Sequence, residues 1–288
     1  MKEVSVIGLG AMGATIAQLF LDRGWRVTVW NRSADKAAAL VARGAVLAPS
    51  AAEAFRAHRA VVMCVYDYEA ASAILALKGV AAAADGRLLL QLTTGSPQDA
   101  RDAQAWAQRH GAAYLDGAIQ AAPDQMGQPD TPVLLSGAAQ ARREAEPLLS
   151  VLAGNVVDLG EEIGAAAAMD LSTLSYVYGA ILGFMHGARV AESEGFDVAR
   201  YGEIVAGIAP AFGTFLQHEG KVIQSGDYAV SQSPMRISVE ATQRLLDTAR
   251  ASGINTEFPA FAAGLLQRAD AAGLGNQEIA ALIKLLRA

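Results

Sequence analysis

Six residues near the start of the chain have the types and the spacing of a phosphate-binding turn. The run Gly8-Leu9-Gly10-Ala11-Met12-Gly13 has the pattern G-x-G-x-x-G and lies between a β-branched run and a helical pattern. Gly8 permits a tight turn, Gly10 lets the backbone approach a pyrophosphate, and Gly13 allows close packing of helix on strand. The phosphates would lie at the helix N-terminus, where free N–H groups and the helix dipole favour anions. We therefore expect these six residues to bind a dinucleotide.

The residues that follow the second predicted strand indicate which dinucleotide is bound. NAD-binding domains usually place an acidic residue here to hydrogen-bond the ribose 2′-OH. This chain has Asn31-Arg32-Ser33, with Lys36 one turn later. A carboxylate would repel a 2′-phosphate, whereas an amide, a guanidinium, a hydroxyl and an ammonium would hold it. The alternative is a surface Arg and Lys without a ligand, but their position at this turn favours NADP(H) binding.

Two titratable residues, Asp170 and Tyr178, lie eight positions apart in a long apolar stretch, with Leu174 midway. In a helix these three positions share one face. A carboxylate and a phenol on one helix face are groups that can take part in acid–base chemistry. Each residue also has a structural interpretation: Tyr178 as a core tyrosine, and Asp170 as an ion-paired or first-turn carboxylate. The helix pattern alone leaves both interpretations open.

Alternating strands and helices through residue 160 must position these residues. The helix starts are marked by Ser33 as a cap, by Ser50 with Glu53 as a capping box, and by Ser96-Pro97. The alternation predicts a mostly parallel sheet covered on both faces. The expected strands are Val4–Leu9, Arg26–Trp30, Ala60–Val65, Leu88–Leu92, Tyr114–Gly117, Thr131–Ser136 and Asn155–Leu159.

The character of the chain changes after Gly160. Glu162 to Glu194 contains no proline and no strand pattern, and it predicts one long, mostly apolar helix. Such a helix must be buried on most faces, and the remaining amphipathic helices can hardly cover it, which indicates a partner chain. We expect an α/β fold with a Rossmann domain (1–161), a long interdomain helix (162–194) and an all-α domain (195–288), assembled as an intertwined homodimer.

Composition excludes several classes of function. The 288 residues are 52% hydrophobic and carry a net charge of -6, which indicates a globular protein without a basic surface for nucleic acid or anionic membranes. The apolar run Val177 to Met185 is too short to cross a bilayer. Cys64 is the single cysteine, and the N-terminal residues lack the pattern of a signal peptide, so we expect a cytoplasmic protein. We expect no metal.

Several motifs together resemble the β-hydroxyacid dehydrogenase superfamily, over essentially the whole chain. They are the glycine turn, Asn31-Arg32-Ser33, Thr93-Thr94-Gly95-Ser96-Pro97 and the long helix. Within the superfamily, Tyr114-Leu115-Asp116-Gly117-Ala118-Ile119 and Gly226-Asp227-Tyr228 are similar to the NADPH-dependent imine reductases. The resemblance implies a cofactor site that also includes Cys64, Val65, Thr93 and Thr94. It also implies a C₂ homodimer whose cleft lies between the Rossmann domain of one subunit and the helical domain of the other.

The departures from the dehydrogenases separate the two families. A dehydrogenase would carry a serine and two glycines at Gln120-Ala121-Ala122, and a catalytic lysine and an asparagine at Asp170 and Leu174. An aspartate cannot exchange the alcohol proton at neutral pH unless its pKa is strongly raised, and a leucine has no proton chemistry. Imine reductases also lack this lysine, and they place a tyrosine or aspartate two turns later, here Tyr178.

The resemblance therefore implies reduction of cyclic imines to amines by hydride transfer from NADPH to the C=N carbon, with reductive amination as an extension. Tyr178 would donate a proton or position an iminium, and Asp170 would stabilise the cation. We expect Leu174, Leu182, Met185, Phe212, His218 and Met235 as pocket lining. Two alternatives stay open. A carbonyl or hydroxy-acid reductase would need a cationic group for the substrate carboxylate, and a non-catalytic NADPH-binding protein would need no proton donor.

Overall fold

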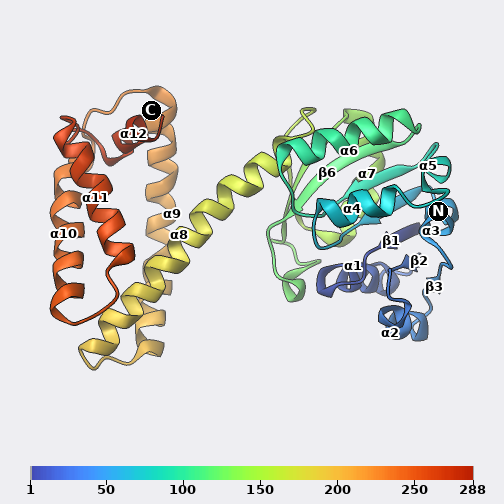
Figure 1. Ribbon diagram of the computed structural model, residues 1–288, viewed down its shortest axis with the longest axis horizontal. Helices are drawn as coiled ribbons and strands as arrows, with labels where there is room; N and C mark the ends of the chain where they lie inside the picture. Colours follow the sequence, from blue (N-terminus) through green and yellow to red (C-terminus); the bar gives the residue numbers. More distant parts are fainter. Residues whose placement is uncertain (1, 288) are drawn as a thin grey trace. The chain divides into compact units, whose positions relative to one another are not determined.

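The computed structural model describes residues 2–287. Contacts within the chain group the residues up to Ser175 into one compact unit and those from Tyr176 onward into a second. In the described part of the chain, every strand lies in the first unit and the second is helical (Figure 1). This confirms the predicted fold class: an α/β Rossmann domain, a long helix and an all-α C-terminal domain.

One eight-stranded sheet organises the first unit, in the order β3-β2-β1-β4-β5-β6-β7-β8. The strands are parallel except where β7 runs antiparallel to β6. The strand order reverses direction between β1 and β4, and ligands of open α/β sheets bind outside the carboxyl ends of the strands at such a point. The bounds are β1 Glu3–Ile7, β2 Arg26–Trp30, β3 Val46–Leu47, β4 Ala60–Met63, β5 Leu88–Gln91, β6 Ala113–Ile119, β7 Pro132–Gly137 and β8 Asn155–Asp158.

Helices cover both faces of this sheet because successive strand residues point to opposite sides. Val4 and Val6 of β1 join one core with residues of α1, α2 and α7, whereas Ile7 joins another with residues of α3 to α6. Figure 1 shows these two layers. The bounds are α1 Ala11–Asp22, α2 Ala38–Ala42, α3 Ala51–Ala57, α4 Tyr68–Leu75, α5 Val80–Ala83, α6 Pro97–Arg109 and α7 Ala139–Leu152.

The three predicted helix starts have different outcomes. Ser96 forms a complete capping box with Asp99, with Pro97 in the first turn, as predicted. The Ser50 hydroxyl accepts the Glu53 N–H at 3.1 Å, but the Glu53 carboxylate pairs with Arg56 instead of closing the box. The prediction that Ser33 caps a helix is wrong. A 3₁₀ turn follows it, and the Lys36 N–H bonds to the Ser33 carbonyl at 3.3 Å while the hydroxyl caps nothing.

The second unit is built from helices around a small core of its own. Met235 is fully buried there, packed with Tyr228 and Leu266. The expectation that Met235 lines a pocket is therefore wrong, because the helix it begins buries it against its neighbours. The remaining bounds are α8 Ala165–Ser193, which begins in the first unit, α9 Val198–Ser225, α10 Met235–Ala251, α11 Glu257–Ala271, η3 Ile279–Leu282 and α12 Ile283–Leu286.

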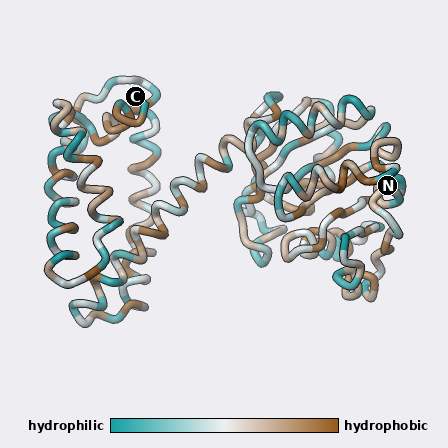
Figure 2. Tube along the Cα trace, in the orientation of Figure 1, coloured by the Kyte–Doolittle hydropathy of each residue, from teal (hydrophilic) through white to brown (hydrophobic). Residues whose placement is uncertain are grey.

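The long helix α8 is mostly uncovered within the single chain, as the sequence predicted. Only Ala166, Ala167 and Asp170, all in its first two turns, are buried within this chain. Figure 2 shows apolar residues recurring along the helix. By length and composition alone, the whole of α8 passes as a candidate membrane span, although its uninterrupted apolar run, Val177 to Met185, is much shorter than the helix. Its large exposed apolar side chains are Met169, Leu171, Tyr176, Val177, Tyr178, Ile181, Leu182 and Met185.

Candidate functional site

The glycine turn between β1 and α1 has the form that a dinucleotide needs. A Cβ on Gly8, whose φ is +94°, would lie 2.1 Å from the Cys64 carbonyl oxygen, and a Cβ on Gly13 would lie 2.1 Å from the Gly8 oxygen. Both positions therefore exclude a side chain. A Cβ on Gly10, in contrast, would meet no atom within 4 Å. The space over Gly10 is open, as the approach of a pyrophosphate requires.

The first turn of α1 presents an uncompensated helix N-terminus to this space. Gly10 is the N-cap residue, no side chain caps the helix, and its first turn contains no acidic residue. The first N–H groups of a helix have no partner within the helix, and the dipole adds partial positive charge. The turn lies at the carboxyl end of β1, next to the switch point of the sheet. Its residues fit the phosphates of a dinucleotide.

Asn31, directly after β2, links the glycine turn to the turn that carries Arg32 and Lys36. Its side-chain oxygen accepts the Leu9 N–H at 3.0 Å, and its amide nitrogen donates to the Ser33 carbonyl at 3.0 Å. Arg32, Ser33 and Lys36 are exposed on the same turn. Neither Arg32 nor Lys36 forms an ion pair with any residue between 2 and 287. The charges suited to a 2′-phosphate are therefore available, and Asn31 fixes the turn that carries them.

The loops after β4 and β5 are tied together beside the glycine turn. The Val65 N–H donates to the Thr93 hydroxyl at 3.0 Å, and the Thr93 N–H donates to the Gln91 side-chain oxygen at 3.2 Å. Thr93 is buried, whereas Thr94 is exposed. Burial raises the pKa of the Cys64 thiol to about 11, so this thiol stays neutral and unreactive. Thr93 and Cys64 therefore shape the loops, and Thr94 offers a hydroxyl to a ligand.

Asp170 is a buried carboxylate in the second turn of α8. Its residue is 4% exposed, and it forms no ion pair within the described residues. Burial raises the pKa of Asp170, and a hydrogen bond from Gln120 opposes this effect. The Gln120 amide also donates to the Thr173 hydroxyl one turn later. In the sequence, Gln120 is only a departure from the dehydrogenase pattern. In the structure, the Gln120 side chain holds Asp170 and the start of α8 by hydrogen bonds.

A buried cluster next to Asp170 was not predicted. Asp116 of β6 is 2% exposed and accepts hydrogen bonds from the Tyr68 hydroxyl of α4 and, at 3.4 Å, from the Tyr114 hydroxyl. The two tyrosine oxygens lie 3.0 Å apart. Burial, with a smaller contribution from Asp170, raises the pKa of Asp116 to about 7, against the two tyrosine hydrogen bonds. The sequence feature that could have revealed this cluster is Asp116, a single carboxylate within an apolar strand. It follows Tyr114 by two positions and therefore lies on the same face of the strand.

Tyr178 lies two turns beyond Asp170 on α8. It is 62% exposed, so it is not a core residue of this single chain. Of the expected pocket lining, Leu182, Met185 and Phe212 are exposed, while Leu174 and His218 are partly exposed.

Two family models together match almost the whole chain. Residues 3–160 match the NAD binding domain of 6-phosphogluconate dehydrogenase. Residues 162–288 match the C-terminal domain of NADPH-dependent reductive aminase-like proteins.

Individual relatives agree with both models. An NADPH-dependent reductive aminase of Aspergillus oryzae is 29% identical over 98% of this chain and 96% of its own. The structure of a reductive aminase from Aspergillus terreus with NADPH and ethyl levulinate is 33% identical, covers 99% of each chain and has a TM-score of 0.93. That of an imine reductase from Myxococcus stipitatus with NADP⁺ is 31% identical over 99% of each chain, with a TM-score of 0.92.

Proposed function

The chain belongs to the imine reductases and reductive aminases of the 6-phosphogluconate dehydrogenase-like superfamily, and we propose that it reduces small imines to amines through Asp170 and Tyr178. It is a soluble NADPH-dependent oxidoreductase. The observation that carries the proposed mechanism is the buried Asp170, which has no ion-pair partner within the described residues. Such a carboxylate is suited to a substrate that is positively charged when it reacts.

NADPH supplies a hydride from C4 of its nicotinamide. Gly8 to Gly13 would hold the pyrophosphate, and Arg32, Ser33 and Lys36 would hold the 2′-phosphate on the turn that Asn31 fixes. Cys64, Val65, Thr93 and Thr94 would border the same cofactor at the ends of β4 and β5, with Thr94 presenting its hydroxyl. The residues of this site therefore fit NADP(H).

Asp170 would act on the charge of the substrate. A neutral imine accepts a hydride poorly, whereas a protonated iminium accepts it well. A buried carboxylate attracts the iminium more strongly than one in water, because the local dielectric constant is low. Burial raises the pKa of Asp170, and the hydrogen bond from Gln120 opposes this effect and favours the carboxylate form.

Tyr178 would hold the substrate nitrogen by a hydrogen bond or donate the proton. Its exposure in the single chain implies that another surface covers it during reaction. A second copy of this chain is the proposed cover, because α8 and α9 expose large apolar side chains that a soluble monomer rarely leaves uncovered. In α9 these are Ile204, Ile208, Phe212 and Leu216. We also place the enzyme in the cytoplasm, where the free thiol of Cys64 stays reduced.

The competing activities lack a supporting feature. A hydroxy-acid reductase needs a cationic group for the substrate carboxylate. At the position of α8 where a dehydrogenase would carry its catalytic lysine, this chain has the buried Asp170, whose negative charge would repel that substrate. A non-catalytic NADPH-binding protein would need neither the buried carboxylate nor a tyrosine on the same helix face. Neither alternative accounts for Asp170.

A substrate panel tests the proposed function. Oxidation of NADPH is followed at 340 nm with a small cyclic imine, with a ketone plus an amine, and in reverse with 3-hydroxy acids and NADP⁺. We expect turnover with the imine and slower turnover with the ketone–amine pair. Turnover with hydroxy acids alone would contradict the proposal.

A further inference from the structure

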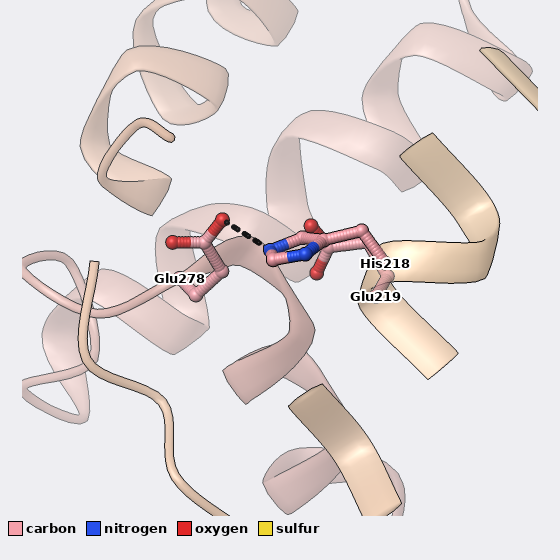
Figure 3. Close-up of side chains that lie close together, drawn as sticks. All are labelled: His218, Glu219 and Glu278. Carbon is pink, nitrogen blue, oxygen red and sulfur yellow. Dashed lines mark ion pairs between the residues drawn. The ribbon is translucent and has the colours of Figure 1, made fainter. Parts of the chain in front are cut away.

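A second group of titratable side chains lies in the C-terminal unit, apart from the residues proposed to bind cofactor and substrate. His218 and Glu219 are neighbours on α9, and Glu278 directly precedes η3 (Figure 3). His218 Nε2 lies 3.5 Å from Glu278 Oε1. One potential ligand atom from each of the three residues lies within 4.8 Å of the other two. His218, expected from the sequence to line a substrate pocket, is therefore packed against two carboxylates.

Each carboxylate accepts a backbone N–H through its Oε2 atom only. Glu219 Oε2 accepts the Ala280 N–H at 3.0 Å, and Glu278 Oε2 accepts the Ser231 N–H at 2.9 Å. Glu219 Oε1 is buried and has no hydrogen-bond partner among residues 2–287. Backbone amides thus orient both side chains, as the outer partners of metal ligands do. Glu219 Oε1 stays without a hydrogen-bond partner among the described residues, and Glu278 Oε1 faces His218 Nε2.

The charge balance of this cluster is incomplete. Glu219 is 7% exposed and Glu278 is 1% exposed. No lysine or arginine pairs with either carboxylate in the part of the chain that the structure describes. Two buried carboxylates beside one imidazole are costly unless a cation joins them.

We propose that His218, Glu219 and Glu278 bind one divalent transition-metal ion, such as Zn²⁺, through His218 Nε2 and the two Oε1 atoms. Imidazole and carboxylate groups are ordinary ligands of Zn²⁺, and three protein ligands leave a position for water. The His218 side chain is 31% exposed, which gives the ion an entry path. The Ser231 hydroxyl, 3.0 Å from His218 Nε2, would give up that contact when the ion binds.

The ion would tie α9 to the segment that starts η3, about 60 residues later in the chain. A ligand that binds only the folded state raises stability by mass action. The proposed role is therefore to stabilise the helical unit, and it does not depend on the proposed imine chemistry.

The test uses the full chain without an affinity tag, freed of metal by a chelator and dialysed. Titration calorimetry with ZnCl₂ should show one ion per chain, and the melting temperature should rise with ZnCl₂ concentration. Glu219→Gln should weaken Zn²⁺ binding at least tenfold. Glu203→Gln, an exposed α9 residue paired with Arg200, is the matched control and should bind like the wild type.

Two results would overturn the proposal: no Zn²⁺ binding by the wild-type chain, or equal binding by Glu219→Gln. Far-UV circular dichroism and NADPH binding report whether each variant is folded. If Glu219→Gln does not fold, His218→Gln replaces it because that side chain is partly exposed, and the same tenfold loss is expected. Equal binding by folded His218→Gln would also contradict the site.

Discussion

At the residue scale, the structure divides the predicted site residues into those whose side chains are exposed and those whose side chains hold other groups of the protein in place. Arg32, Lys36 and Thr94 are exposed and available to a ligand, whereas Asn31 and Thr93 use their side chains within the protein. This division was not predictable from sequence, because residue type and spacing do not show which partner a side chain meets.

The cofactor preference depends on Arg32. Arg32→Ala should weaken NADPH binding roughly 10- to 100-fold, the effect of losing a charge-assisted contact to the 2′-phosphate, and leave NADH binding nearly unchanged. Fluorescence titration with each cofactor measures this. Arg23→Ala, an exposed arginine at the end of α1, is the control. Equal losses for NADPH and NADH would contradict the assignment.

The buried Asp116 should make stability depend on pH. Its folded pKa of about 7 is above the usual value of 3.8, so the folded state retains a proton that the unfolded state has lost. The contribution of Asp116 to the free energy of unfolding is therefore fully present below pH 3.8 and is lost as the pH rises through 7. Over this range the free energy of unfolding falls by up to about 1.4 kcal/mol per pH unit. Urea unfolding measures the free energy of unfolding of the wild type and of Asp116→Asn at pH 5 and at pH 8. Between these two pH values, that free energy should fall less for the variant than for the wild type. Identical pH dependence would exclude Asp116 as its source.

At the element scale, the strand–turn–helix start of the chain was predictable in detail, because each glycine has a separate steric reason. The antiparallel β7 and the two-residue β3 were not, because local patterns do not report pairing partners. Among site residues, Asp170 was predicted, but the contacts that Gln120 and Asp116 make around it link segments about 50 residues apart. Such contacts depend on topology, and no motif encodes them.

Two glycines of the turn should separate folding from binding. Gly13→Ala places a Cβ against the Gly8 oxygen and should lower the free energy of unfolding by on the order of 2 kcal/mol or more. Gly10→Ala meets no protein atom, so it should leave stability within about 0.5 kcal/mol of wild type while weakening NADPH binding at least tenfold. Thermal unfolding and NADPH titration test both. Normal NADPH binding by Gly10→Ala would contradict the pyrophosphate site.

At the scale of the whole molecule, the sequence predicted both the long helix and the lack of cover for it within one chain. Its sequence has the composition of a buried helix, and the chain buries only its first two turns. Apolar composition therefore indicated that α8 must be covered without showing which molecule covers it. We propose that a second copy of this chain covers α8.

Sedimentation velocity at micromolar concentration should show a dimer. Leu182→Asp, on the exposed face of α8, should shift the distribution towards monomer and reduce imine turnover at least tenfold, because the cover over Tyr178 is lost. Leu77→Asp, at an exposed leucine of the first unit, should remain dimeric and active. A monomeric wild-type enzyme with full activity would contradict the proposed dimer.

The central claim is that Asp170 stabilises a cationic substrate, and Asp170→Asn tests it most directly. The measurement is kcat/KM for a cyclic imine, with NADPH affinity determined separately to show an intact cofactor site. Loss of the buried negative charge should lower kcat/KM about 100-fold or more while NADPH affinity stays within a factor of about two. An unchanged kcat/KM in Asp170→Asn would contradict the proposed mechanism.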